Sequence, residues 1–168
     1  IPFPTKTKNL HHEVELVVFI KSECVNIDPS EASTHIFGYA VGVDLTKRDL
    51  QSAAKEASKP WDLSKGFDNS APISKIIKKE GFLLDKGSIS LNVNGQNRQS
   101  SNILNMVWKV DELISWLSKF ITLKAGDIIF TGTPAGVGRL VPKDKIDAEI
   151  ENVGTVSYTH LTLPTKQD

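Results

Sequence analysis

One short segment, residues 11–20, limits the possible folds more than any other part of the chain. Its second half, Leu-Val-Val-Phe-Ile at positions 16–20, has the apolar, β-branched composition of a buried strand. Glu13 and Glu15 stand just before it, and side chains two positions apart on a strand point to the same face. Two ionised carboxylates on one buried face repel each other and lose hydration, which is costly unless a positive charge lies between them. The segment therefore predicts either a solvated strand edge or a divalent cation site, and all-oxygen ligands favour Mg²⁺, Mn²⁺ or Ca²⁺.

Length and composition are those of a single globular domain. The 168 residues are enough to bury a core, and 20 basic residues balance 20 acidic ones, so no field of one sign predicts nucleic acid or an anionic membrane as a partner. No apolar run approaches the roughly 20 residues that span a bilayer. The single cysteine, Cys24, excludes an internal disulfide and a cysteine-rich zinc module, which is typical of a reducing compartment. We therefore expect a protein of the cytoplasm or the mitochondrial matrix.

A second apolar run, residues 36–45, predicts another buried strand and has one carboxylate, Asp44, near its end. By itself such a residue is typical of a turn. Together with Glu13 and Glu15 it could occupy one side of an octahedral Mg²⁺ or Mn²⁺ ion and leave the other positions to water and substrate. This open arrangement is what a catalytic metal requires.

The segment that follows predicts a helix. Thr46 and Asp49 have the spacing of a capping box, and the helix would run to about residue 57. Its expected inward positions are Leu50, Ala53, Ala54 and Ala57. Arg48 and Gln51 share another stripe of this helix, near its start. Such residues usually face solvent, so Arg48 and Gln51, like Lys65 farther along the chain, matter only if the fold brings them to the carboxylates.

Strands dominate the rest of the pattern. Residues 89–93, the dipeptide Asn94-Gly95 and residues 96–99 predict a β-hairpin with a type I′ turn. Residues 102–120 have apolar positions at helical spacing and predict the longest helix, and residues 145–150 predict a late strand. Many strands and few helices, without regular alternation, indicate a β-rich α+β domain.

Histidines offer an alternative metal site. His11 and Glu13, with His35 or His160 from elsewhere in the chain, imitate the two-histidine, one-carboxylate triad of iron enzymes. Adjacent histidines point to opposite faces of a strand, so at most one of His11 and His12 can join the carboxylates. A zinc deaminase site is excluded because it requires a pair of cysteines.

A glycine-rich segment, residues 132–138, follows another short apolar run. It lacks the Gly-Lys-Ser/Thr of a phosphate-binding loop, and Pro134 removes one backbone N–H. The segment predicts either a simple tight turn or a loop in which Thr133 and nearby backbone amides hold a substrate carboxylate.

Five motifs, in this order and at this spacing, closely resemble the fumarylacetoacetate hydrolase family, and within it the small acylpyruvate hydrolase and oxaloacetate decarboxylase branch. The motifs are His11–Leu16, Gly42–Gln51, Lys59–Asp68, Asn92–Gln99 and Gly126–Gly138. The resemblance extends from residue 1 to about residue 155, so it is far more specific than any single motif.

The resemblance implies a mixed β-sandwich roll, a homodimer, and a Mg²⁺ or Mn²⁺ ion bound by Glu13, Glu15 and Asp44. It also implies four substrate contacts: Arg48, Gln51, Lys65 and Thr133. The implied substrate is a small 2-keto acid, and the implied reaction is hydrolysis of the C–C bond of acylpyruvates, which are 2,4-dioxo acids, to pyruvate and a carboxylic acid. Lys65 would be a catalytic residue that stabilises the pyruvate enolate. The same site would equally serve oxaloacetate decarboxylation or tautomerisation.

The resemblance also sets the expected domain limits. Residues 1–156 would form the catalytic domain, and residues 157–168 would form a tail unlike the family's closing strand. The family's water-activating His and Glu belong to a segment before the position where this sequence starts, so we expect an N-terminal part to be missing. A chain without them could be a metal-binding remnant with impaired catalysis.

Overall fold

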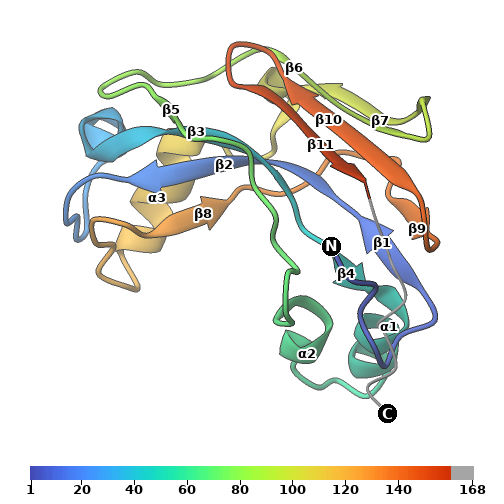
Figure 1. The fold of residues 1–168 in the computed structure, drawn as a ribbon. Helices are drawn as coiled ribbons and strands as arrows, with labels where there is room; N and C mark the ends of the chain where they lie inside the picture. Colours follow the sequence, from blue (N-terminus) through green and yellow to red (C-terminus); the bar gives the residue numbers. More distant parts are fainter. Residues whose placement is uncertain (160–168) are drawn as a thin grey trace.

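The computed structural model describes residues 1–159. Its strands form three sheets (Figure 1). The first sheet, in the order β5-β3-β2-β8, contains Ile77–Lys78, Ile36–Val43, Val14–Ile20 and Ile128–Phe130. The second, in the order β11-β10-β6-β7, contains Gly154–Thr159, Lys145–Ile150, Ser88–Val93 and Gln96–Asn102. The third, in the order β4-β1-β9, contains Thr46–Lys47, Leu10–His12 and Gly138–Leu140. All these strand pairs are antiparallel.

Helices are few and short. They are α1, α2 and α3 at Arg48–Glu56, Asp62–Lys65 and Val110–Ser118, and the 3-10 helices η1 and η2 at Pro29–His35 and Ile103–Asn105. Figure 1 shows α1 and α2 together at one end of the molecule, apart from α3, which packs against η1. The predicted β-rich α+β class is therefore confirmed.

Strand β2 lies at the centre of the fold, and all seven of its residues are buried. It pairs with β3 on one side and with β8 on the other. Leu16, Val18 and Ile20 belong to the main core, which the second sheet completes, whereas Val17 and Phe19 belong to a smaller apolar cluster. Burial on both faces explains why residues 16–20 of β2 form a continuous apolar run instead of alternating.

The hairpin predicted from Asn94-Gly95 is confirmed. β6 and β7 pair on either side of this dipeptide, with Val93 opposite Gln96. Asn94 and Gly95 have φ angles of 52° and 78°, the positive values that a type I′ turn requires at both central positions. The late strand predicted over residues 145–150 is confirmed as β10.

The helix predicted over residues 102–120 is wrong in its first half. The chain there forms only the single 3-10 turn η2 before α3 begins at Val110. The Lys109 N–H donates a 2.8 Å hydrogen bond to the Glu112 carboxylate, which caps α3 at that point. Val107, one of the apolar residues at helical spacing in this segment, is 94% exposed.

The capping box predicted at Thr46 and Asp49 is also wrong. Thr46 belongs to strand β4, and α1 starts two residues later. The Asp49 carboxylate instead accepts hydrogen bonds from the Thr7 hydroxyl at 2.6 Å and from the Lys8 N–H at 2.8 Å, so it ties the entry segment to α1.

The predicted apolar inner face of α1 is wrong for a related reason. Gln51 is the buried residue of this helix, Leu50 and Ala54 are half-buried, and Ala53 and Ala57 are exposed. A helix that buries a polar side chain needs a polar neighbour for it. Helix α1 covers a cluster of charged groups and not the apolar core.

Strand β11 includes the first three residues of the predicted tail, 157–159, which pair with residues 145–147 of β10. The remaining tail residues, 160–168, lie outside the described part of the chain. Within that part, no helix is long and apolar enough to cross a membrane.

Candidate metal centre

Three carboxylates converge where β1 passes into β2 and where β3 ends. Glu13 lies at the break between β1 and β2, Glu15 is the second residue of β2, and Asp44 directly follows β3. The Asp44 N–H donates a 2.8 Å hydrogen bond to the Glu13 carbonyl, which holds these two chain segments together. One carboxylate oxygen from each of the three residues lies within 4.8 Å of the other two. The structure thus brings together the acidic residues that the sequence singled out.

Lys65, the last residue of α2, supplies positive charge to this cluster. Its ammonium donates hydrogen bonds to the Glu13 carboxylate at 2.7 Å, to the Asp44 carboxylate, and to the Thr46 hydroxyl at 2.8 Å. The Lys65 side chain is 32% exposed, so it can be reached by a small ligand. Thr46 was missed as part of the site because its position before a helix made it look like a cap.

Arg48 and Gln51 complete the side of the cluster that α1 covers. The Arg48 guanidinium donates to the second oxygen of the Glu13 carboxylate and to the side-chain oxygen of Gln51. Its Nε also donates to Nδ1 of His11 at 3.4 Å. Both predicted substrate-contact residues of this helix therefore lie at the carboxylates, and the buried face of α1 is polar for that reason.

The protonation equilibria of the cluster indicate a shortage of positive charge. Burial raises the pKa of Glu15 to about 7, and the nearby charges of Asp44 and Glu13 add to the rise. Burial also raises the pKa of Asp44, against the hydrogen bond from Lys65. Burial alone lowers the pKa of Lys65, but its hydrogen bonds to Asp44 and Glu13 outweigh this and raise it. A bound divalent cation would supply the missing charge.

The glycine-rich loop reaches the cluster through its backbone. The Gly132 N–H donates a 2.7 Å hydrogen bond to Glu15 Oε2. Thr131 donates twice to the Leu16 carbonyl, from its hydroxyl at 2.8 Å and from its N–H at 3.2 Å, which fixes the start of the loop on β2. The sequence left open a simple tight turn or a loop whose backbone amides hold a substrate carboxylate, and the Gly132 N–H orients a carboxylate of the protein.

Thr133 stands apart from the other predicted site residues. Within the described part of the chain, its hydrogen-bond partner is Gln99, whose Nε2 donates to Thr133 Oγ1 at 2.8 Å. Gln99 is fully buried and also contacts Val14, the residue after Glu13. Sequence reasoning missed Gln99, and the available signal was a polar residue on the strand predicted after the Asn-Gly turn.

His12 and His35 bond to polar side chains outside the carboxylate cluster. His12 is buried and makes a 2.9 Å hydrogen bond from Nδ1 to Gln99 Oε1, whereas His35 bonds to the Ser22 hydroxyl. Burial lowers the pKa of both His11 and His12. Among the described residues, the metal-ligand cluster contains carboxylates and no histidine, so the iron-triad alternative finds no support there. His160 lies outside the described residues.

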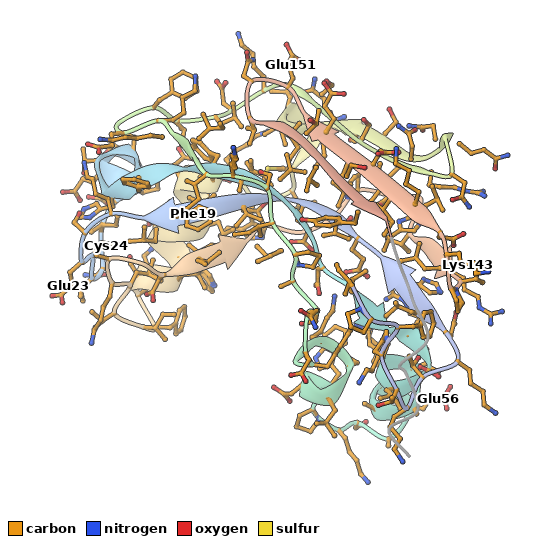
Figure 2. All side chains as sticks on the ribbon, viewed as in Figure 1. Phe19, Glu23, Cys24, Glu56, Lys143 and Glu151 are labelled. Carbon is orange, nitrogen blue, oxygen red and sulfur yellow. The ribbon has the colours of Figure 1, made fainter. Side chains whose placement is uncertain are left out.

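The cluster lies at the end of β2 that is close to α1 and α2. Figure 2 shows Phe19 and Cys24 toward the opposite end of β2 from Glu56 of α1. Cys24 is a buried free thiol at that far end. The single cysteine therefore takes no part in the candidate metal site.

A cavity of about 690 Å³ borders the loop Thr131–Ala135. Its walls include Leu16 of β2 and the aromatic side chains of Trp108 and Trp116. Neighbouring residues of a strand point to opposite faces, so the Leu16 side chain points away from the side that carries Glu15. Leu16 thus lines this cavity from the face of β2 opposite Glu15, and the loop that borders the cavity also binds Glu15 through Gly132.

Comparison with known proteins identifies close relatives. The sequence pattern of the family described as fumarylacetoacetate (FAA) hydrolase, C-terminal, matches residues 1–159. The chain is 40% identical over 159 residues to a fumarylpyruvate hydrolase from Ralstonia sp, which covers 95% of this chain and 83% of that relative. It is 41% identical over 160 residues to a mitochondrial oxaloacetate tautomerase from Homo sapiens, which covers 95% of this chain and 72% of that relative.

A solved structure agrees with these sequence matches. The fumarylpyruvate hydrolase from Pseudomonas aeruginosa in complex with Mn²⁺ and pyruvate superposes with a TM-score of 0.94 at 39% identity. The superposition covers 97% of this chain and 70% of that one. The match therefore spans the elements that carry the carboxylate cluster.

Proposed function

Because the chain belongs to the fumarylacetoacetate hydrolase family, we propose that it hydrolyses the C–C bond of acylpyruvates at a divalent metal ion and releases pyruvate and a carboxylic acid. The observation that carries this proposal is the convergence of Glu13, Glu15 and Asp44 beside the ammonium of Lys65. The relative from Pseudomonas aeruginosa supports it, because that protein holds Mn²⁺ and pyruvate, and pyruvate is one product of the proposed reaction.

We infer that the three carboxylates bind Mg²⁺ or Mn²⁺. Their oxygens suit a hard cation, and the raised pKa of Glu15, about 7, reflects burial beside two other acidic groups that such a cation would offset. When bound, the ion polarises a 2-keto acid and offsets the negative charge that develops on its oxygens. Three protein ligands would leave other coordination positions of such an ion to substrate and water.

The donors around the cluster are suited to a small 2-keto acid. The carboxylate and carbonyl oxygens of such a substrate only accept hydrogen bonds, and Lys65 and Arg48 only donate them. Arg48 offers a planar fork for a carboxylate, and Gln51 holds it in place from the same helix. Thr133 approaches from the loop and would donate its hydroxyl proton. These four residues are therefore our proposed substrate contacts.

The proposed reaction adds one water molecule across a C–C bond. The oxygen of a water molecule forms a bond to the acyl carbonyl carbon of the 2,4-dioxo acid, and the bond between that carbon and C3 then breaks. The electron pair of the broken bond stays with the pyruvate part as an enolate, while the acyl part leaves as a carboxylic acid that keeps the water oxygen and one of its protons. The water releases its other proton, and the enolate takes up one proton at C3, so one water is consumed overall. Lys65 is the proposed catalytic residue, because its ammonium can stabilise the negative charge of the enolate.

A second candidate function is the tautomerisation or decarboxylation of oxaloacetate at the same site. The human relative carries the name oxaloacetate tautomerase. Loss of a proton from C3 of oxaloacetate, or loss of carbon dioxide, leaves an enolate of the same kind as C–C hydrolysis does. The same donors would therefore serve all three reactions. That relative is also described as mitochondrial, which supports the mitochondrial matrix as one of the two expected compartments.

We also propose a homodimer. Exposed apolar side chains lie before, on and just after α3, and we refer to this set as the aromatic surface: Leu104, Val107, Trp108, Trp116 and Phe120. The ring of Trp116 lies 5.4 Å from that of Trp108 and 5.0 Å from that of Phe120. Exposed clusters of this kind mark interaction sites, and aromatic residues dominate the energy of interfaces. A second copy of the chain would cover them.

The experiment that tests the function uses the metal-free chain before and after addition of Mn²⁺ or Mg²⁺. We expect metal-dependent release of pyruvate from fumarylpyruvate, lost in Glu15→Gln and strongly slowed in Lys65→Met. Conversion of oxaloacetate without this cleavage would favour the second candidate function. Metal binding without either reaction would favour the catalytically impaired remnant, and absence of metal binding would overturn all three.

A further inference from the structure

Gln99 is a polar residue at a buried position of strand β7, where an apolar side chain is usual. Among the residues of β7, all of which the structure describes, Gln99 alone is buried, and its exposed fraction is 0%. A buried amide is stable only when its donors and acceptors are satisfied. Gln99 meets this condition with four hydrogen bonds, to Val14, His12, Pro134 and Thr133.

Two of these bonds identify the oxygen and the nitrogen of the Gln99 amide. The Val14 N–H donates to Gln99 Oε1 at 3.1 Å, and a backbone N–H can only donate. Gln99 Nε2 donates to the Pro134 carbonyl at 2.9 Å, and a carbonyl can only accept. The orientation of the amide therefore follows from backbone chemistry alone.

The other two bonds then have only one possible direction. Because Oε1 accepts, His12 must donate from Nδ1, at 2.9 Å, which fixes the tautomer of the neutral imidazole. Because Nε2 donates, Thr133 Oγ1 must accept, at 2.8 Å. A hydroxyl has one proton, so the Thr133 proton is not used in this contact and remains available for another acceptor.

The same amide joins two parts of the proposed site. Val14 directly follows Glu13, and Thr133 directly follows Gly132, whose N–H binds Glu15. Gln99 thus ties the segment that carries two of the carboxylates to the loop that carries Thr133. The size of the Gln99 side chain affects where the Thr133 hydroxyl lies. Its donor Nε2 leaves the proton of that hydroxyl available for another acceptor.

We propose that Gln99 is a positioning residue that keeps the Thr133 hydroxyl as a hydrogen-bond donor to the carboxylate of the bound keto acid. This inference rests on the proposed function, because it assumes that Thr133 contacts the substrate. A carboxylate only accepts hydrogen bonds. A Thr133 hydroxyl whose proton is donated to an acceptor on the protein could not donate a hydrogen bond to that carboxylate.

Gln99→Glu tests the inference because it keeps the size of the side chain and replaces the donor Nε2 by an acceptor oxygen. The Thr133 proton would then turn toward the new carboxylate and away from the ligand. Gln96→Glu is the matched control: it makes the same chemical change on the same strand, at an exposed position. Oxalate, a planar dicarboxylate, serves as the probe, and calorimetry measures its affinity for the Mn²⁺-loaded chain.

The expected result is a loss of oxalate affinity of about ten-fold in Gln99→Glu, the scale of one hydrogen bond to a charged group, with unchanged Mn²⁺ affinity. Gln96→Glu should bind oxalate like the parent chain. Thr133→Val should show a loss similar to that of Gln99→Glu, and combining the two should add nothing, because the first acts through the second. In turnover the loss should fall on KM and leave kcat nearly unchanged.

Unchanged oxalate affinity in Gln99→Glu would overturn the inference, and so would losses that multiply in the double variant, since a merely structural residue would not depend on the Thr133 hydroxyl. If Gln99→Glu does not fold, Gln99→Met, which adds no buried charge, takes its place in the same double-variant comparison. Failure of the parent chain to bind oxalate with Mn²⁺ would overturn the proposed function itself, and the inference with it.

Discussion

The N–H of Gly132 donates a 2.7 Å hydrogen bond to Glu15 Oε2, although the two residues are 117 positions apart in the chain. This bond fixes one carboxylate of the cluster relative to the loop. It also favours the ionised form of Glu15, against the burial that raises the pKa of that carboxyl to about 7. Gly132 has a φ angle of 98°, which side-chain-bearing residues rarely adopt. The identity of this residue is therefore tied to the geometry of the proposed metal site.

The first prediction concerns Gly132→Ala. A Cβ at this position would meet open space, so the change acts through the backbone angle alone. We expect a loss of about 1–3 kcal/mol in the free energy of unfolding, because the loop must either hold a strained angle or relax. Relaxation would move the N–H away from Glu15, and Mn²⁺ affinity should fall by about ten-fold, the lower end of the cost of losing a group that orients a metal ligand. Urea unfolding and calorimetric Mn²⁺ titration measure the two effects.

Gly126→Ala is the control for this prediction. Gly126 has a similar φ angle, 95°, and open space around it. It lies in the turn before β8, whereas the glycine-rich loop follows the other end of that strand. It should lose similar stability and keep its Mn²⁺ affinity. Equal losses of affinity in both variants would show that the Gly132 hydrogen bond does not support the site.

The second prediction concerns pH and the metal-free chain. The pKa of Glu15 is raised in the folded protein to about 7 from an ordinary value of 4.5, so the folded state binds more protons than the unfolded state between these two values. The contribution of Glu15 to the free energy of unfolding is therefore largest below about pH 4.5. It decreases as pH rises from about 4.5 through about 7. Glu15→Gln removes this group, and we expect its unfolding temperature to be higher than that of the parent at pH 8.

Thermal unfolding between pH 5 and pH 8, in the presence of a chelator, tests this expectation. The parent should lose several degrees over this range, and Glu15→Gln should lose less. Glu149→Gln, an exposed change on β10, is the control and should follow the parent. A pH profile that is the same in all three chains would contradict the buried, proton-binding state of Glu15. With Mn²⁺, Glu15→Gln should bind at least about 100-fold more weakly, because loss of a ligand costs more than loss of a group that orients one.

The third prediction concerns Lys65→Met. Lys65 neutralises Glu13 and Asp44, and because its side chain is 32% exposed its ion pairs are partly screened. We expect the metal-free variant to lose about 1–2 kcal/mol of unfolding free energy through repulsion among the three carboxylates. Saturating Mn²⁺ supplies the missing charge, so the rise in unfolding temperature on adding metal should be larger in the variant than in the parent.

Lys59→Met, at an exposed lysine after α1, serves as the control and should behave as the parent does. A strong loss of Mn²⁺ affinity in Lys65→Met would contradict the role we assign, because Lys65 is proposed to bind and stabilise the substrate and not the metal.

Local sequence patterns were sufficient for much of this fold. The continuous apolar run of residues 16–20 in β2, the positive φ angles that Asn94-Gly95 adopts, and the alternation of β10 are all properties of a few neighbouring residues. The pairing of Glu13 with Glu15 likewise follows from strand geometry. Their approach to Asp44 does not, because it depends on the register in which β2 pairs with β3, where Glu15 lies opposite Gly42.

The parts that local patterns could not predict depend on partners distant in the sequence. Asp49 looked like a helix cap but binds Thr7 and Lys8, which are 42 and 41 positions away. Gln99 could not be recognised as a connection between two segments of the site, because Val14 lies 85 positions before it and Thr133 lies 34 positions after it. A single sequence carries no signal for such contacts, so it identifies the ligand types better than the residues that orient them.

The fourth prediction concerns the aromatic surface. In the proposed homodimer this surface is buried, so a charge placed at Trp116 would have to lose its hydration at the interface. Trp116→Glu should therefore be a monomer by light scattering at concentrations where the parent is a dimer. Trp61→Glu is the control, because Trp61 is exposed to nearly the same degree, 45% against 46%, but lies beside α2 and packs under Lys55. Dimers of both variants would exclude the aromatic surface as the interface, and a monomeric parent would overturn the proposed assembly.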